Sequence, residues 1–132
     1  MPEAPYIKHV KYDENSPIID REQLDMLVVS DGREDDLELA GELFELFANE
    51  SAAKLYALPE VCSQGDANQL RNIVHFVAGS AGNLGLARLS AFYRGIEQAI
   101  DEQRLTDLSE VEAPIRYEFE IARDAFRTNF NL

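Results

Sequence analysis

The sequence predicts an all-α protein, an antiparallel up-and-down four-helix bundle with a short additional N-terminal helix. Three observations support this fold class. Apolar residues recur at three- and four-residue steps in four successive runs, which is the spacing of one helix face. No run alternates apolar and polar residues as a half-buried strand does, and the connections between the periodic runs are short. With 132 residues, of which 45% are hydrophobic, the chain is long enough to bury the core of one domain.

The N-terminal part has a different pattern from the rest. Residues 1–16 contain two prolines and a mixed polar pattern, so we expect a flexible arm ahead of a domain spanning residues 17–132. Asp20, with Gln23 three residues later, is typical of a helix N-cap. A short helix is therefore expected to begin here, and Gly32 interrupts it.

A long helical pattern begins at about Asp35 and continues to Cys62. Pro59 lies inside this run and should kink the helix or end it early, because proline has no backbone N–H and clashes with the preceding turn. We expect Gly65 to end the run and Asp66 to cap the next helix.

Three further helices complete the bundle. The apolar residues of the first of them fall on an arc about 100° wide on a helical wheel; they are Leu70, Ile73, Val74, Val77, Ala81 and Leu84. The next helix runs through Leu86 to Ile100. The last begins near Ser109, where Glu112 completes a capping-box pattern, and Pro114 leaves a later start open.

Composition disfavours several classes of protein. The formal net charge of −13 disfavours a nucleic-acid partner. Polar and charged residues break every apolar stretch, so no membrane span is predicted, and the chain does not open with a signal-peptide pattern. Cys62 alone cannot form an internal disulfide, which fits a reducing compartment. We therefore expect a cytoplasmic protein with no membrane partner.

The acidic charge is unevenly distributed along the chain. Residues 67–96 contain no Asp or Glu but three arginines, Arg71, Arg88 and Arg94. Such a segment either offers a surface to a negatively charged partner or forms a packed central hairpin with few solvent positions. Composition does not decide between these two interpretations.

His75 points roughly 150° away from the centre of its helix's apolar arc, which predicts an exposed imidazole. Ala78 and Gly79 follow one turn later, and Gly82 two turns later. Glycine in a helix interior costs about 1 kcal/mol relative to alanine. We expect these small residues to leave the imidazole accessible to a macromolecular partner. Close helix packing is the alternative; it partly explains Gly82 but not Gly79.

The run HFVAGSAGNLG at 75–85, followed by LARLSAFYRGIE, resembles the signature of histidine-containing phosphotransfer (HPt) domains. That signature reads approximately H-x-L-K-G-S-(S/A)-x-x-L-G and precedes a helix that ends in Leu-Glu. The matching residues are His75, Gly79, Ser80, Ala81, Asn83, Leu84 and Gly85, with Ile96 and Glu97 in the place of Leu-Glu. The resemblance covers roughly residues 17–130 and implies a four-helix bundle with an exposed histidine in mid-helix.

The resemblance implies a phosphoryl carrier rather than an enzyme. His75 would take a phosphoryl group from the aspartate of one receiver domain and pass it to another in a multistep phosphorelay. The implied partner is a response-regulator receiver domain or a hybrid sensor histidine kinase, and the chain would act as a monomer. No cofactor is expected here, because Mg²⁺ would belong to the receiver domain. We expect the reaction at Nε2, which reaches furthest from the helix.

The family usually has a lysine three residues after the histidine, where this chain has Ala78. Because charge neutralisation carries most of a phosphoryl transfer, this loss predicts a slower relay. Arg71, one turn before His75, is the candidate replacement, although its spacing fits a solvated surface arginine equally well. A degenerate HPt-like module that docks a receiver or kinase without efficient phosphotransfer is the alternative function.

The expected docking face comprises Ala78, Gly79 and Gly82, with Phe76 either half exposed at its edge or a peripheral core residue. Ser80 is expected to bond to backbone or cap the helix end. A surface without carboxylates would let an acidic receiver approach without repulsion. A metal-dependent enzyme is disfavoured by two histidines, one cysteine and no Glu-x-x-His spacing. A plain structural bundle is the last alternative.

Overall fold

The computed structural model describes residues 2–27 and 34–130, and this part of the chain is helical with no strand. The elements are α1 (Arg21–Leu27), α2 (Glu34–Leu55), α3 (Leu58–Gln64), α4 (Ala67–Asn83), α5 (Ala87–Asp101), the 3-10 turn η1 (Leu108–Glu110) and α6 (Glu112–Phe130). The predicted all-α class is therefore confirmed. Over the same residues, no helix is both long and apolar enough to cross a membrane.

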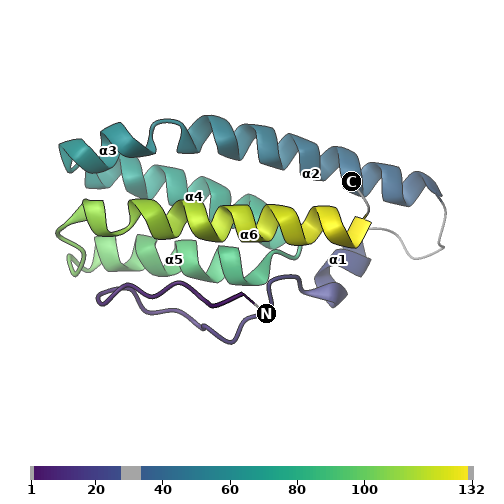
Figure 1. Cartoon of the computed structure of the whole chain (residues 1–132), viewed down its shortest axis with the longest axis horizontal. Coiled ribbons are helices and arrows are strands. Elements are labelled where there is room, and N and C mark those ends of the chain that lie inside the picture. The colour runs from purple at the N-terminus through teal and green to yellow at the C-terminus, as the bar shows by residue number, and fades with distance from the viewer. Residues whose placement is uncertain (1, 28–33, 131–132) are drawn as a thin grey trace.

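Four helices form the bundle, and α3 continues the line of α2 at one end (Figure 1). α4 packs against α2 and α5, and α6 packs against the same two helices, so the four surround a common core. Successive long helices run in opposite directions (Figure 1). The short α1 contacts α4. This is the predicted antiparallel up-and-down bundle with an additional N-terminal helix.

The core is one continuous cluster of apolar side chains from the helices and the N-terminal segment. The rings of Phe44 on α2 and Phe126 on α6 stack with centroids 4.4 Å apart. All the residues predicted for the apolar arc of α4 are buried, namely Leu70, Ile73, Val74, Val77, Ala81 and Leu84.

Backbone chemistry sets the boundary between α2, α3 and α4. Pro59 lies in the first turn of α3, where the missing N–H costs no helical bond, so it divides the long periodic run as predicted. Gly65 ends α3 in the left-handed region, with φ of 66°. Asp66 Oδ1 accepts a hydrogen bond from the N–H of Gln69 at 3.1 Å and caps α4.

The start of α1 also follows the predicted pattern. Asp20 Oδ1 accepts from the backbone N–H of Glu22 at 3.1 Å and of Gln23 at 3.3 Å. The expected interruption at Gly32 lies outside the described residues. Gly85, in the turn between α4 and α5, contacts this start: its carbonyl accepts from Asp20 N–H at 2.6 Å.

The last helix begins later than its capping pattern indicates. Ser109 lies in η1, and Asp107 Oδ1 accepts from its backbone N–H at 3.1 Å. α6 then starts at Glu112, with Pro114 inside its first turn. The later start that Pro114 left open is the one observed.

The N-terminal segment, residues 2–16, has no helix and runs along the outside of α5 (Figure 1). Ile7 and Val10 are buried in the core. A Cβ at Gly95 of α5 would lie 2.7 Å from the carbonyl oxygen of Lys11, so only glycine permits this approach. The helical periodicity did not predict this packing. The expected flexibility of residues 1–16 concerns motion and stays a prediction, as does the boundary at residue 17.

A buried ion pair joins this segment to two helices. Arg88 Nε on α5 donates to Glu118 Oε1 on α6 at 3.0 Å, and both side chains are fully buried. Arg88 Nη1 also donates to the carbonyl oxygen of Pro2 at 2.8 Å. Burial raises the pKa of the Glu118 carboxyl, and the hydrogen bond and charge of Arg88 offset part of this effect. Removal of either partner would leave a buried charge uncompensated.

Candidate functional site

His75 lies in the middle of α4, on the side turned away from the core. Its side chain is 62% exposed, which confirms the exposure predicted from the helical wheel. A histidine that belonged to the core would need a buried partner for its ring nitrogens. The imidazole is instead reachable from outside the protein.

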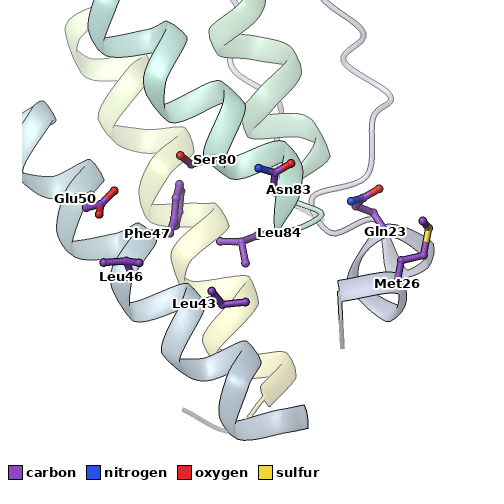
Figure 2. A pocket seen from close by; sticks show the side chains of 9 residues that line it. All are labelled: Gln23, Met26, Leu43, Leu46, Phe47, Glu50, Ser80, Asn83 and Leu84. Carbon is purple, nitrogen blue, oxygen red and sulfur yellow. The ribbon is translucent and has the colours of Figure 1, made fainter. Parts of the chain in front are cut away.

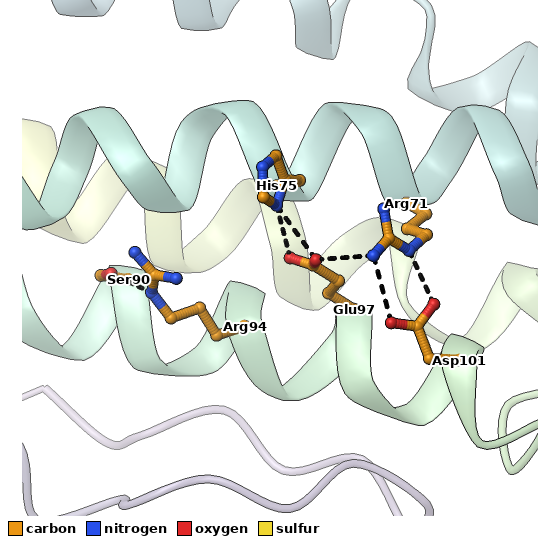
Figure 3. A network of polar contacts seen from close by, with 6 residues as sticks. All are labelled: Arg71, His75, Ser90, Arg94, Glu97 and Asp101. Atoms are coloured by element: carbon orange, nitrogen blue, oxygen red, sulfur yellow. Dashed lines mark hydrogen bonds and ion pairs between the residues drawn. The ribbon is translucent and has the colours of Figure 1, made fainter.

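Glu97 on α5 fixes the orientation of this ring (Figure 3). His75 Nδ1 lies 3.0 Å from both carboxylate oxygens of Glu97, whose side chain is only 15% exposed. An ionised carboxylate can only accept, so in the neutral ring Nδ1 carries the proton and Nε2 keeps the lone pair. The contact therefore selects the tautomer with a nucleophilic Nε2.

Arg71 connects Glu97 to a second carboxylate, Asp101 (Figure 3). Arg71 Nη2 lies 3.1 Å from Glu97 Oε1, and Arg71 Nε donates to Asp101 Oδ1 at 2.6 Å. The hydrogen bond from Arg71 is the main cause that lowers the pKa of Asp101 from its ordinary value. His75, Glu97, Arg71 and Asp101 form one chain of contacts, here called the histidine network. With a neutral imidazole, its two carboxylates outweigh its one guanidinium.

The histidine network overturns the expectation of a surface free of carboxylates. Residues 67–96 contain no acidic residue, but α5 runs antiparallel to α4 and brings Glu97 beside His75 and Asp101 beside Arg71. The motif comparison identified Glu97 as the match to the glutamate of the Leu-Glu pair but predicted no function for it. Asp101 was missed, although it stands four residues after Glu97 and so shares its helix face.

Ala78 does not belong to the docking face, because it is fully buried. Its carbonyl oxygen accepts a hydrogen bond from Ser90 Oγ of α5 at 2.9 Å. The wheel assigned α4 one apolar arc, but α4 packs against α2, α3 and α5, so its buried arc is wider. The inclusion of Ala78 among the exposed residues was therefore wrong.

The two glycines differ from each other. A Cβ added at Gly79 would meet no heavy atom within 4 Å outside its own helix, so internal packing does not explain this glycine. A Cβ at Gly82 would lie 3.3 Å from Ser90 Oγ, a tight contact with α5. Packing thus accounts partly for Gly82, as expected, and Gly79 leaves open space one turn after His75.

Phe76 and Ser80 lie toward α2 rather than toward Glu97. Phe76 is partly buried and packs against the core, with Lys54 Nζ 5.1 Å from its ring centroid, so it is a peripheral core residue. Ser80 lines a cavity of about 550 Å³ between α1, α2 and the end of α4 (Figure 2). Met26 and Leu46 in its wall are 76% and 55% exposed. The sequence motifs did not predict this apolar cavity.

The described residues contain no group of three or more His, Cys, Asp or Glu side chains able to hold a metal ion. An exposed, oriented imidazole with a free Nε2 can act as a nucleophile and carry an acyl or phosphoryl group.

Comparison with known proteins decides between these uses. Residues 42–127, more than half of the chain, match the family model of the Hpt domain. The chain belongs to the Hpt domain family. This membership confirms the resemblance inferred from the motif around His75.

The fold of this Hpt protein is similar to a solved structure, the crystal structure of histidine-containing phosphotransfer protein B (HptB) from Pseudomonas aeruginosa PAO1. The two share 22% sequence identity over 88% of this chain and 96% of that chain, with a TM-score of 0.71. The TM-score over these lengths shows a common fold. No curated protein sequence matches the chain. Membership of the family makes this chain a histidine phosphotransfer protein of two-component signalling, and proteins of this family are phosphoryl carriers that interact with receiver domains and histidine kinases.

Proposed function

We propose that this Hpt protein relays a phosphoryl group between the aspartates of two receiver domains in a multistep phosphorelay, with Nε2 of His75 as the carrier atom. The observation that carries the proposal is the exposed imidazole whose Nδ1 lies against Glu97. This contact leaves the lone pair of Nε2 available to attack a phosphoryl group.

The transfer is an in-line displacement at phosphorus. The Nε2 lone pair forms the N–P bond while the P–O bond to the donor aspartate breaks, and the leaving carboxylate takes the bonding electron pair. The imidazole gains positive charge in this step, and the carboxylate of Glu97 at Nδ1 stabilises that charge. The same step in reverse passes the group to the next receiver.

The partner we propose is a response-regulator receiver domain or the receiver of a hybrid sensor histidine kinase. It would reach the imidazole over the open backbone at Gly79. Exposed Met26 and Leu46, in the wall of the apolar cavity, would supply hydrophobic contact area. Any Mg²⁺ belongs in the acidic pocket of the receiver, so we propose no cofactor for this chain. We also propose that it acts as a cytoplasmic monomer.

The absence of a lysine at Ala78 and the net negative charge of the histidine network favour one alternative function, that of a docking module. The network puts the Glu97 carboxylate against the ring that would carry the phosphoryl group, followed by the Arg71 guanidinium and then the Asp101 carboxylate. Arg71, the candidate replacement for the family's lysine, directs its Nε and Nη2 to the two carboxylates. In this geometry it positions Glu97 more directly than it neutralises phosphate. A module that docks a receiver without efficient transfer would tolerate this balance.

A labelling experiment tests the relay. The protein is incubated with receivers carrying ³²P on their aspartate and with Mg²⁺, and the label is analysed for acid lability and base stability. We expect such a label on wild type and on His9→Gln, the matched control at the other histidine, and none on His75→Gln. Label that persists in His75→Gln, or is absent from wild type with every candidate receiver, rejects the relay.

A further inference from the structure

The histidine network leaves a charge problem at the site. A phosphoryl group on a side chain carries a charge of about −1.5 to −2 at pH 7. On His75 it would lie close to Glu97, whose carboxylate contacts Nδ1 of the same ring, while Asp101 follows further along the network beyond Arg71. The one guanidinium of Arg71 offsets only part of this negative charge. If Arg71 turned to the phosphoryl group, it would leave two neighbouring carboxylates without their partner. A cation from outside the network is needed for efficient transfer.

Arg94 on α5 is a candidate for this cation. It precedes Glu97 by three residues, which is about 4.5 Å along the helix axis. It is exposed, and it forms no ion pair with any carboxylate in the described part of the chain. Its Nε donates to Ser90 Oγ at 3.3 Å, a long contact that a turn of the flexible side chain can exchange for a better one.

The surroundings of Arg94 place it beside the position that the family's lysine would occupy. Ser90, which binds Arg94, also donates to the carbonyl oxygen of Ala78. Arg94, Ser90 and Gly82 line a cavity of about 300 Å³ where the end of α4 and the first turns of α5 meet the start of α1, and Asp20 also lines it. Figure 3 shows the guanidinium of Arg94 on the seam between α4 and α5, on the face of the two helices that also carries His75. A Cβ added at Gly79, one turn after His75, would meet no heavy atom within 4 Å outside its own helix.

We propose that Arg94 is a phosphoryl-binding residue: it leaves Ser90 and donates charge-assisted hydrogen bonds to the phosphoryl group on Nε2 of His75. The cation that the family places on the histidine helix is thereby supplied from the adjacent helix. This inference rests on the proposed function, because it assumes that His75 carries a phosphoryl group. No covalent bond changes on Arg94 itself.

A small-molecule donor tests the proposal without a receiver. Wild type, Arg94→Ala, Arg94→Lys and Arg71→Ala are incubated with potassium phosphoramidate, and phosphohistidine at His75 is followed by mass spectrometry. Arg123→Ala on α6 is the matched control. We expect Arg94→Ala to slow phosphorylation roughly 10- to 100-fold, the worth of one charge-assisted contact, and to shorten the lifetime of the phosphorylated protein. Arg94→Lys should recover most of the rate, because it restores the charge, and Arg123→Ala should match wild type.

A rate for Arg94→Ala within twofold of wild type overturns the proposal. Arg71→Ala measures separately the effect of releasing Glu97 from its guanidinium partner. A defect of Arg94→Ala that occurs only with receivers also overturns the proposal, since Arg94 would then contact the receiver instead. Circular dichroism establishes that the variants are folded, and Arg94→Gln provides a second neutral variant. If phosphoramidate labels wild type and no receiver does, the relay fails while the result for Arg94 stands.

Discussion

Replacement of Gly79 by alanine should stabilise the protein, although this position lies at the functional surface. An added Cβ meets no heavy atom within 4 Å outside its own helix, so the methyl group fits without displacement. Glycine is less favourable than alanine in a helix interior by about 0.8–1.0 kcal/mol. We therefore expect the free energy of unfolding to rise by roughly 1 kcal/mol and the thermal midpoint by roughly 3–5 °C.

Replacement of Gly79 by tryptophan should separate folding from function. The indole would project one turn after His75 into the space that a receiver must enter. Since a misplacement of about 1 Å can cost about 100-fold in rate, transfer from a phosphorylated receiver should fall by about 100-fold or more. Phosphoramidate is small enough to pass the indole, so its labelling of His75 should fall far less.

Two assays measure these effects on the same set of variants. Urea denaturation gives the free energy of unfolding, and rapid quench with labelled receiver gives the transfer rate. Gly82→Ala is the control, because its Cβ would lie 3.3 Å from Ser90 Oγ and should gain less stability than Gly79→Ala. A Gly79→Trp protein that accepts phosphate from receivers at the wild-type rate would refute the docking geometry, and a destabilised Gly79→Ala would refute the open space at this position.

Three further predictions concern the network and the buried ion pair. Glu97→Gln removes the charge that holds the proton on His75 Nδ1, so the transfer rate should fall about 10- to 100-fold. Labelled receiver measures this rate, and an unchanged rate would assign Glu97 a purely structural role. Arg88→Met and Glu118→Leu should each lower the free energy of unfolding by about 3–5 kcal/mol, because each leaves its buried partner without a counter-charge. Urea denaturation should show the double variant close to wild type, and a double variant as unstable as either single variant would contradict this. Burial raises the pKa of Glu118 above its ordinary value of 4.5, so the folded state binds this proton more tightly than the unfolded state. The contribution of Glu118 to stability should therefore fall as pH rises above about 4.5, and the stability of wild type relative to Glu118→Gln should fall with it; a difference that rises with pH would reverse the sign.

The features that sequence predicted correctly depend on chemistry within one helix or at its end. Pro59 divides α2 from α3 because its ring and missing N–H act on its own turn. Asp66 caps α4 through a bond to a residue three positions away. The exposure of His75 follows from the apolar periodicity of α4 alone.

The features that sequence missed depend on how neighbouring segments are placed. The burial of Ala78 and the contact of Glu97 with His75 are set by the rotation and register of α5 against α4, which the spacing within either helix does not contain. The N-terminal segment has no periodicity from which packing could be predicted. Gly95, a glycine inside α5, was the available signal, because the backbone of Lys11 passes directly over it.

The hydrogen bond from Arg88 to the carbonyl oxygen of Pro2 matters for protein engineering. A design that uses this bundle in a synthetic signalling circuit and begins at residue 17 would lose two core side chains, Ile7 and Val10. It would also lose the backbone that packs over the buried guanidinium of Arg88. Water would then reach the Arg88–Glu118 pair, and α5, which carries Glu97 and Arg94, would lose its outer support. A domain that is to be transferred to another protein should therefore include residues 2–16 as well as the helices.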